Sequence, residues 1–366
     1  MILRNQLISK KYLFFIFLVC LSIFSSKWIL SYVFFSDDLS LKIIFDTPSD
    51  GYFYYAHLKA LSLFDFNNSF DISVHDLKNI SLPFATLLFP SILYSLIGFY
   101  SLIILELVFT YFYILIFFLL MRQVEFKEIN ALCCSLLIIA LPSILALMNL
   151  ENVVYINVIS QFFDLRFPRP FLINIVFYFF IFYLFKLNNK EIFTYRNFII
   201  VSLILSYSLA SFYYFFFIQA LALIIYIIHQ NKFKNFFYAK NLKYLFVFSI
   251  FFLFFLLPFI YFLVTSEPDY NERFNLLDLN FERKKILIFY LLQKLSSFKF
   301  LIIFFLITTL TVFSNYKKIK FFDYINILYY LFISSIVAPF LFIIISNKTG
   351  IVYHFINLIV LTTFIY

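Results

Sequence analysis

The sequence predicts an all-α, polytopic transmembrane helical bundle, and three features of the chain support this. Of its 366 residues, 64% are hydrophobic and 13% are charged, whereas a typical soluble domain is about half apolar and about a quarter charged. The apolar residues form long runs, and about 20 of them cross a bilayer core as a helix. The charged residues lie mostly in loops between these runs. The length allows about 9–11 spans in a single membrane domain over residues 1–366.

Other classes of protein are excluded by the composition. Disorder needs low hydrophobicity and high charge, and this chain has the opposite balance. Only three glycines are present, which leaves no glycine-rich loop for a nucleotide-binding domain. The three cysteines lie in apolar runs and predict neither disulfides nor a zinc site. The net charge of +9 is scattered over short loops, so we expect it to orient the chain in a membrane rather than to bind nucleic acid.

The N-terminal part begins with an apolar run at 12–35, which is too long for a cleaved signal peptide and predicts a first span. A polar outer loop follows at 36–81. Pro90 and a glycine then divide the next apolar stretch into a short, membrane-dipping helix at 84–97 and a full span at 99–121.

The middle part contains a predicted span at 129–148, a second polar outer loop at 149–170 and a return helix at 171–185. Residues 197–228 form an apolar stretch that is too long for one span and short for two. Its serine-rich centre predicts a hairpin turn at Ser206–Ser211.

The C-terminal part adds four predicted apolar segments, at 244–263, 300–315, 325–346 and 351–366. The loop at 264–299 is polar and outer, with an apolar stretch at 286–292 expected at the membrane interface. The last segment stays apolar up to Tyr366, so we expect that the chain is truncated at its C-terminus.

The charges are sorted by side in this layout. The N-terminus and the loops on its side carry 15 Lys/Arg and 4 acids, whereas the opposite loops carry 12 Lys/Arg and 14 acids. The positive-inside rule then places the N-terminus in the cytoplasm and the acidic loops outside, as expected for a multi-pass protein of a bacterial inner (plasma) membrane.

The first outer loop contains the main candidate catalytic residue, Asp50. A helix that begins there carries Asp50, Tyr54, His57 and Leu61 on one face, with Tyr55 beside them. A partly desolvated carboxylate near a membrane can accept a proton from a nucleophile, so Asp50 is a candidate general base and Tyr54, Tyr55 and His57 are candidate substrate contacts. The alternative is that Asp50 only caps the helix and the aromatic row only packs.

This arrangement resembles the GT-C superfamily of integral membrane glycosyltransferases, such as protein O-mannosyltransferases and aminoarabinose transferases. The resemblance rests on one span, an acidic outer loop with a Tyr-rich helix, and the proline-bearing stretch "ISLPFATLLFPSILYSLIGFYS". It implies a polyprenyl-phosphate-sugar donor and a glycolipid, surface glycan or protein acceptor. It also implies an essential acidic residue, which corresponds here to Asp50, with Asp37 or Asp38 as alternatives. Bacterial transferases of this kind modify lipopolysaccharide or other envelope glycans.

The second outer loop contains "SQFFDLRFPRPF", in which prolines stiffen a segment that carries Arg166 and Arg169. Arginine suits bidentate recognition of phosphate, so both are candidate ligands of the donor phosphate. Asp164 is a weak candidate ligand of a divalent cation such as Mg²⁺ or Mn²⁺, as the resemblance implies. Alternatively, the arginines anchor the membrane interface, or Asp164 pairs with Arg166.

Two further residues allow other interpretations. His354 stands near an outer helix start, where it either contacts the donor or packs at the interface. Glu106 lies inside a predicted span, and an intramembrane carboxylate indicates either proton coupling or a hydrogen bond within the bundle. The alternative function is therefore a transporter or flippase of lipid-linked glycans or other solutes. A polymerase or ligase of surface glycans would share the donor chemistry.

Overall fold

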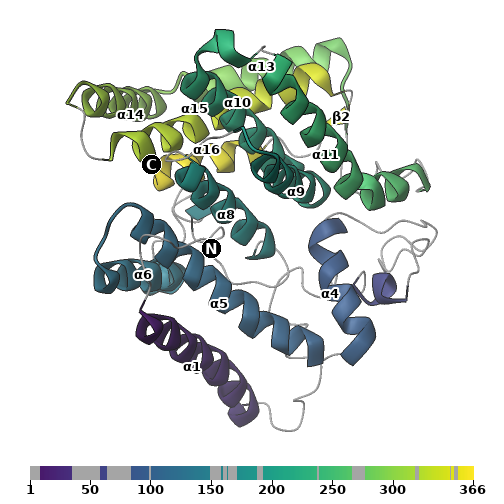
Figure 1. Cartoon of the computed structure of the whole chain (residues 1–366), viewed down its shortest axis with the longest axis vertical. Helices are drawn as coiled ribbons and strands as arrows, with labels where there is room; N and C mark the ends of the chain where they lie inside the picture. The colour runs from purple at the N-terminus through teal and green to yellow at the C-terminus, as the bar shows by residue number, and fades with distance from the viewer. Residues whose placement is uncertain are drawn as a thin grey trace. The chain divides into compact units, whose positions relative to one another are not determined.

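The computed structural model is all-α apart from one short pair of strands, which confirms the predicted polytopic helical bundle (Figure 1). The residues that it describes are 9–34, 58–63, 84–98, 100–148, 158–159, 163, 171–187, 193–236, 239–265, 277–317, 321–346, 348–349 and 353–366.

Six helices in the described residues are long and apolar enough to cross a membrane. They are α5 (Tyr100–Gln123), α6 (Glu128–Leu147), α10 (Tyr213–Phe236), α11 (Ala239–Thr265), α14 (Phe298–Lys317) and α15 (Phe322–Ile345). Each covers a segment that the sequence predicts to be apolar and helical. The first predicted span coincides with α1 (Lys10–Phe34). The chain is therefore a multi-pass membrane protein, and the full number of 9–11 spans stays a prediction.

A short helix, α4 (Phe84–Ile97), precedes α5 as the sequence predicts. Its 14 residues rise about 21 Å, which is less than the bilayer core of about 30 Å. Pro90 lies inside it. Gly98 ends it with a φ of +61°, a left-handed conformation that glycine adopts without a steric penalty. The predicted division of this apolar stretch into a short helix and a longer one is confirmed.

Contacts divide the chain into two compact units, each with its own packing. Unit 1 contains Met1–Asn152 and Ser160–Phe182, and unit 2 contains Val153–Ile159 and Tyr183–Tyr366. The predicted single membrane domain over 1–366 stays a prediction.

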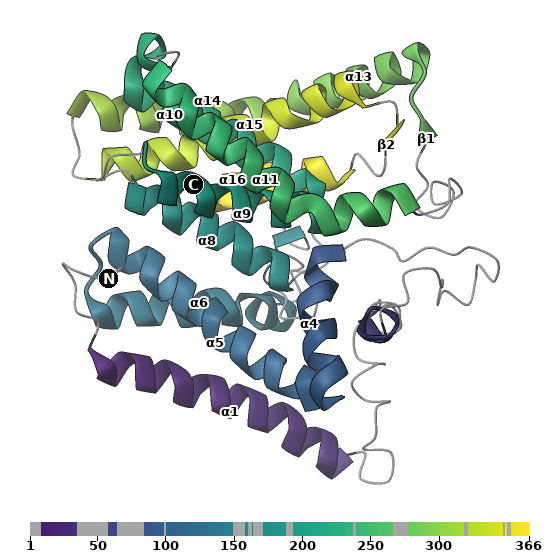
Figure 2. The same cartoon turned by 45° about the vertical axis from the view of Figure 1, so that its right-hand side comes forward.

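In unit 1, α1 packs antiparallel against α5, which also contacts α4 and α6 (Figure 2). The ring of Tyr12 lies 6.3 Å from that of Phe118, and the ring of Phe17 lies 6.3 Å from that of Tyr111. At one end, the backbone N–H of Ser9 donates to Oε1 of Glu128 at 3.2 Å. The N-terminal segment and the start of α6, which the sequence assigns to one side, therefore lie at one end of unit 1.

In unit 2, α10 packs between α9 (Tyr195–Ser211) and α15, and α9 also packs against α11. α16 (Tyr353–Ile365) and α14 cover other faces of α15. The α15–α16 contact includes a hydrogen bond of 2.8 Å between the hydroxyls of Ser335 and Thr362. Aromatic rings also meet between these helices: the ring of Tyr214 on α10 lies 4.7 Å from that of Phe355 on α16.

Three predicted basic loops, at 186–196, 229–243 and 316–323, meet at one end of unit 2. Two ring contacts at this end join α8 (Phe171–Leu187) and α10 to α15: Phe185 lies 4.9 Å from Tyr324, and His229 lies 5.6 Å from Tyr330. The Nζ of Lys243 on α11 lies 5.7 Å from the ring of Tyr195 on α9, which joins the other two helices at the same end. The helix ends next to these three loops therefore lie together in unit 2, and the side of a membrane that they face stays a prediction.

The opposite end of unit 2 carries segments that the sequence assigns to the other side. The strands β1 (Leu277–Asp278) and β2 (Lys348–Thr349) pair antiparallel there (Figure 2). The apolar stretch predicted at the interface is part of α13 (Phe281–Leu295), which Asn280 caps by accepting from the N–H of Arg283. Leu291 of α13 is buried against Ile343 of α15, whereas most other large side chains of α13 are exposed.

One predicted turn is wrong in position. Ser206–Ser211 is helical to its last residue, and the turn between α9 and α10 is at Phe212. Ser206 is compatible with a helix, because its Oγ donates to the carbonyl of Leu203, three residues back in the same helix, at 3.0 Å. A serine whose hydroxyl is satisfied in this way does not break a helix in an apolar environment. The hydroxyls of Ser208 and Ser211 are buried and have no hydrogen-bond partner among the described residues.

Candidate functional site

Most of the predicted site lies outside the described residues. This applies to Asp50, Tyr54, Tyr55 and His57 in the first outer loop, and to Asp164, Arg166 and Arg169 in the second. Their assigned roles stay predictions. The described part of the chain shows the elements that hold the ends of these two loops.

The end of the predicted Asp50 helix is described. Residues 58–62 are helical, and Leu58 and Leu61 are buried, with exposed fractions of 1% and 2%. Leu61 is the last member of the predicted row that begins at Asp50. The burial of this apolar end agrees with a helix that packs by its C-terminal part.

The arginine-bearing segment 164–170 of the second outer loop is flanked by two buried phenylalanines, Phe163 and Phe171, which belong to one aromatic cluster in unit 1. We define this aromatic cluster as Tyr113, Phe117, Phe163, Phe171 and Tyr178, each exposed by 3% or less. The ring of Phe163 lies 6.0 Å from Phe117 and 6.1 Å from Tyr178. The ring of Phe171 lies 5.3 Å from Tyr113, and Phe117 lies 4.4 Å from Tyr178.

This geometry anchors both ends of the segment 164–170. Phe163 precedes Asp164 directly, and Phe171 follows Pro170 directly, so the arginine-bearing segment leaves the aromatic cluster and returns to it. Buried aromatic pairs of this kind hold their positions firmly, because they bury large areas in fixed orientations.

Sequence reasoning missed these two anchors. It read "FFDLRFPRPF" for its charges and prolines, although apolar residues on either side of a polar segment are a signal of anchoring. Which rings they meet on α5 was not readable, because Tyr113 and Phe117 are more than 40 residues away in the chain.

His354 is described and lies in unit 2. It is half-buried, and its ring lies 5.4 Å from that of Phe212 and 5.1 Å from that of Tyr214. Phe355 beside it packs on Tyr214 at 4.7 Å. His354 is thus part of an aromatic contact between the start of α16 and the α9–α10 turn, and its predicted contact with the donor stays a prediction.

Glu106 lies on α5 in unit 1 and is half-buried. Its backbone carbonyl accepts a hydrogen bond of 2.7 Å from the hydroxyl of Thr110. Glu106 is thus in the second turn of a long apolar helix that begins at Tyr100, as the sequence indicates.

Unit 2 also buries a polar side chain that sequence reasoning missed, Gln219 of α10. It is fully buried, and among the described residues neither its Oε1 nor its Nε2 has a hydrogen-bond partner. The hydroxyls of Tyr226 on α10 and of Ser334 on α15 are also buried, and they too have no hydrogen-bond partner among the described residues. The signal was present, because Gln219 is the one amide in an otherwise apolar run of α10 from Tyr213 to Tyr226.

Metal binding is not supported by the described residues: no three of their His, Cys, Asp or Glu side chains group closely enough to hold an ion. Asp164, the candidate metal ligand, lies outside them.

Comparison with known proteins finds no family model that matches this chain, no similar curated protein and no similar solved structure. The long apolar helices, their aromatic packing and the meeting of the basic loops at one end of unit 2 together identify the chain as a polytopic helical membrane protein.

Proposed function

We propose that this protein is a GT-C-type integral membrane glycosyltransferase. It transfers a sugar from a polyprenyl-phosphate donor to a glycolipid, surface glycan or protein acceptor at the outer face of a bacterial inner membrane. The observation that carries the proposal is the acidic loop 36–81, which stands between α1 and the short helix α4. The proline-containing α4, too short to cross the bilayer, agrees with the pattern on which the resemblance rests.

The proposed reaction needs one base and one anion site. The acceptor hydroxyl oxygen attacks the anomeric carbon, the bond from that carbon to the phosphate oxygen breaks, and the hydroxyl proton passes to the carboxylate of Asp50. The lipid phosphate leaves with the bonding electron pair. Arg166 and Arg169 stabilise this developing charge, and Asp164 holds a divalent cation if one takes part.

The other predicted residues orient the substrates. Tyr54, Tyr55 and His57 stand one to two helical turns after Asp50 and contact the acceptor or the sugar. His354 contacts the donor head group. Phe163 and Phe171, which flank the segment with the two arginines, are both buried in the aromatic cluster, and this places the two ends of the segment beside α5.

The test is Asp50→Asn in a cell in which loss of the gene changes a surface glycan. We expect the variant to be present at normal level and the glycan to be lost, because the amide cannot accept the proton. Asp71→Asn, in the same loop, is the matched control and should retain the glycan. Full retention by Asp50→Asn at normal protein level would contradict the proposal.

The second candidate function is transport of lipid-linked glycans or other solutes, which the half-buried Glu106 in α5 favours. Glu106→Gln separates the two. Loss of function in Glu106→Gln together with normal function in Asp50→Asn would favour transport, and the reverse result favours the transferase.

A further inference from the structure

We propose that α13 is an interfacial helix that binds anionic phospholipid at the surface of the bilayer. Its outward apolar face lies among the upper parts of the acyl chains, and its basic side chains hold lipid phosphates. This inference is independent of the proposed transfer reaction and uses none of the residues assigned to that reaction.

The depth of α13 follows from the helix to which it is joined. Five of the 15 residues of α13 are charged, and α13 is not among the helices that are long and apolar enough to cross a membrane. Only Ser296 and Ser297 separate it from α14, which is such a helix. The 20 residues of α14 rise about 30 Å, so it uses its whole length to cross the core, and Phe298 stands at the core's edge. The C-terminal end of α13 therefore lies at the level of the head groups.

Two faces of α13 are apolar. One face packs within unit 2, where Leu291 is buried against Ile343 of α15. Lys284 fixes the same face, because its Nζ donates to the carbonyl oxygen of Ile344 at 3.1 Å. The other face points outward within an arc of about 140° at 3.6 residues per turn. It carries four large apolar side chains that are between 51% and 80% exposed: Phe281, Ile286, Phe289 and Leu292.

The outward face needs an apolar partner, because large apolar side chains that gather on one exposed face mark an interaction surface. A helix that combines such a face with many Lys and Arg residues is typical of helices that lie at a membrane surface. Since α14 begins at the edge of the bilayer core, lipid is the apolar phase that this face reaches.

The charges of this segment favour an anionic lipid. Residues 281–299 contain a single acid, Glu282, and five basic residues: Arg283, Lys284, Lys285, Lys294 and Lys299. The loops on this side of the predicted layout hold 12 Lys/Arg in total, so nearly half of them gather here, against the positive-inside pattern. Clustered basic residues at a bilayer surface attract anionic head groups. The Nζ of Lys294 also lies 5.4 Å from the ring of Tyr290, and tyrosine is enriched at the membrane interface.

The first experiment measures the depth of the outward face in lipid vesicles that contain the full chain. Trp28→Phe removes the one tryptophan of the chain, and Phe289→Trp then reports on α13. We expect lipids brominated near the head group to quench this tryptophan more than lipids brominated near the chain end. Phe305→Trp, at an exposed position of α14, is the matched control and should show the reverse order. Quenching by aqueous acrylamide alone, or no quenching by any brominated lipid, would overturn the proposal.

The second experiment measures the choice of head group at the same tryptophan. Brominated phosphatidylglycerol competes with unlabelled phosphatidylcholine of the same acyl chains, and the labels are then exchanged. We expect phosphatidylglycerol to be preferred and free glycerol phosphate to leave this preference unchanged. Equal association of the two lipids, or displacement of phosphatidylglycerol by glycerol phosphate, would overturn the proposal.

The variant Lys285→Gln tests the charge on the outward face. It should lower the preference for phosphatidylglycerol about fivefold, as expected for one cation at a lipid surface. Lys317→Gln is the matched control, because it removes one cation at the other end of α14, and it should leave the preference at Trp-substituted position 289 unchanged. Each variant is required to be monodisperse on gel filtration. Equal losses in the two variants, or no loss in Lys285→Gln, would contradict the assigned role of the basic residues.

Discussion

The pair of asparagines between α14 and α15 allows a quantitative test of the bundle. Nδ2 of Asn315 donates to Oδ1 of Asn326 at 3.0 Å, and Nδ2 of Asn326 donates to Oδ1 of Asn315 at 2.9 Å. Asn326 is 6% exposed, whereas Asn315 lies on an exposed face. Each amide thus satisfies the hydrogen-bonding groups of the other. If the pair is broken, only the exposed Asn315 has access to other partners.

The perturbation is a double-mutant cycle with Asn315→Leu, Asn326→Leu and the double variant. Two hydrogen bonds at about 0.6 kcal/mol each in a membrane protein give a coupling energy of about 1.2 kcal/mol. Asn315→Leu should cost more, about 1–3 kcal/mol, because it leaves the amide of Asn326 buried without its partner. Asn326→Leu should cost about 1 kcal/mol, since Asn315 can reach water or lipid head groups.

The assay is reversible denaturation of the purified protein in mixed micelles, followed by helical circular dichroism. We expect the double variant to be less destabilised than the sum of the single variants. A coupling energy near zero, or a greater cost for Asn326→Leu than for Asn315→Leu, would refute the reasoning from burial.

Three further predictions concern stability, each measured by thermal unfolding in detergent. Gln219→Leu should stabilise unit 2 by about 1 kcal/mol, because it removes a buried amide without partners. Gln293→Leu, at an exposed position, is the control and should change the stability little. If Gln219→Leu lowers the stability instead, the amide has a partner that it needs. Phe163→Ala should cost about 3 kcal/mol by leaving a cavity in the aromatic cluster. Phe179→Ala, at a site that is 39% exposed, is the control and should cost less. Equal costs would argue against Phe163 as an anchor of the segment 164–170. Gly98→Ala should cost about 1–2 kcal/mol from its positive φ alone, since an added Cβ meets no atom within 4 Å. Gly98→Asn should cost less, because asparagine tolerates a positive φ better than alanine does. Equal costs of the two variants would point to a cause other than the backbone conformation.

The helix boundaries were predictable where composition changes sharply. The proline and glycine around α4 separate it from α5 in the sequence as they do in the structure, because these residues act on the backbone locally. The turn after α9 was misplaced, since Ser206 satisfies its hydroxyl within its own helix. Serine composition alone does not distinguish a turn from a helix in an apolar setting.

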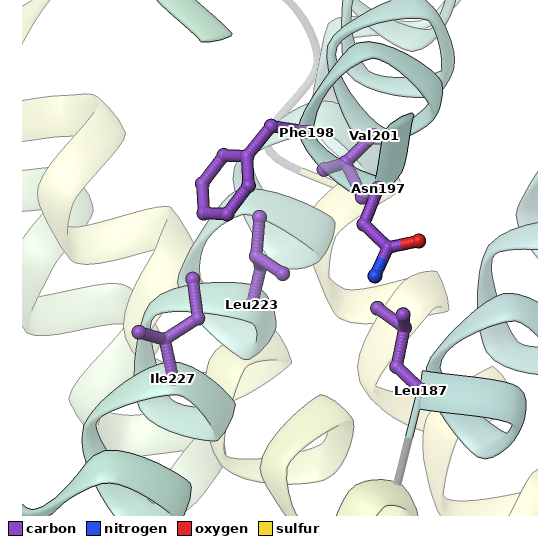
Figure 3. Close-up of a pocket in the computed structure, with 6 residues that line it drawn as sticks. All are labelled: Leu187, Asn197, Phe198, Val201, Leu223 and Ile227. Carbon is purple, nitrogen blue, oxygen red and sulfur yellow. The ribbon is translucent and has the colours of Figure 1, made fainter. Parts of the chain in front are cut away.

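The candidate site was predictable only as residue types. The charges and prolines of 164–170 are visible in the sequence, but the anchoring of this segment depends on contacts between Phe163, Phe171 and α5. The small apolar pocket lined by Leu187, Asn197 and Leu223 (Figure 3) likewise joins residues from three helices. Contacts between distant segments depend on how helices pack, which periodicity does not specify.

The sequence by itself determined the class of the protein, the positions of its apolar helices and the sorting of charge between loops. These follow from local composition, because a bilayer admits only long apolar helices and orients them by their basic loops. The tertiary structure decided which loops meet, where aromatic rings anchor the arginine-bearing segment, and that the amide of Gln219 is buried. These depend on side-chain packing between helices that lie far apart in the chain, where the close fit of the rings and hydrogen bonds between helices select one arrangement.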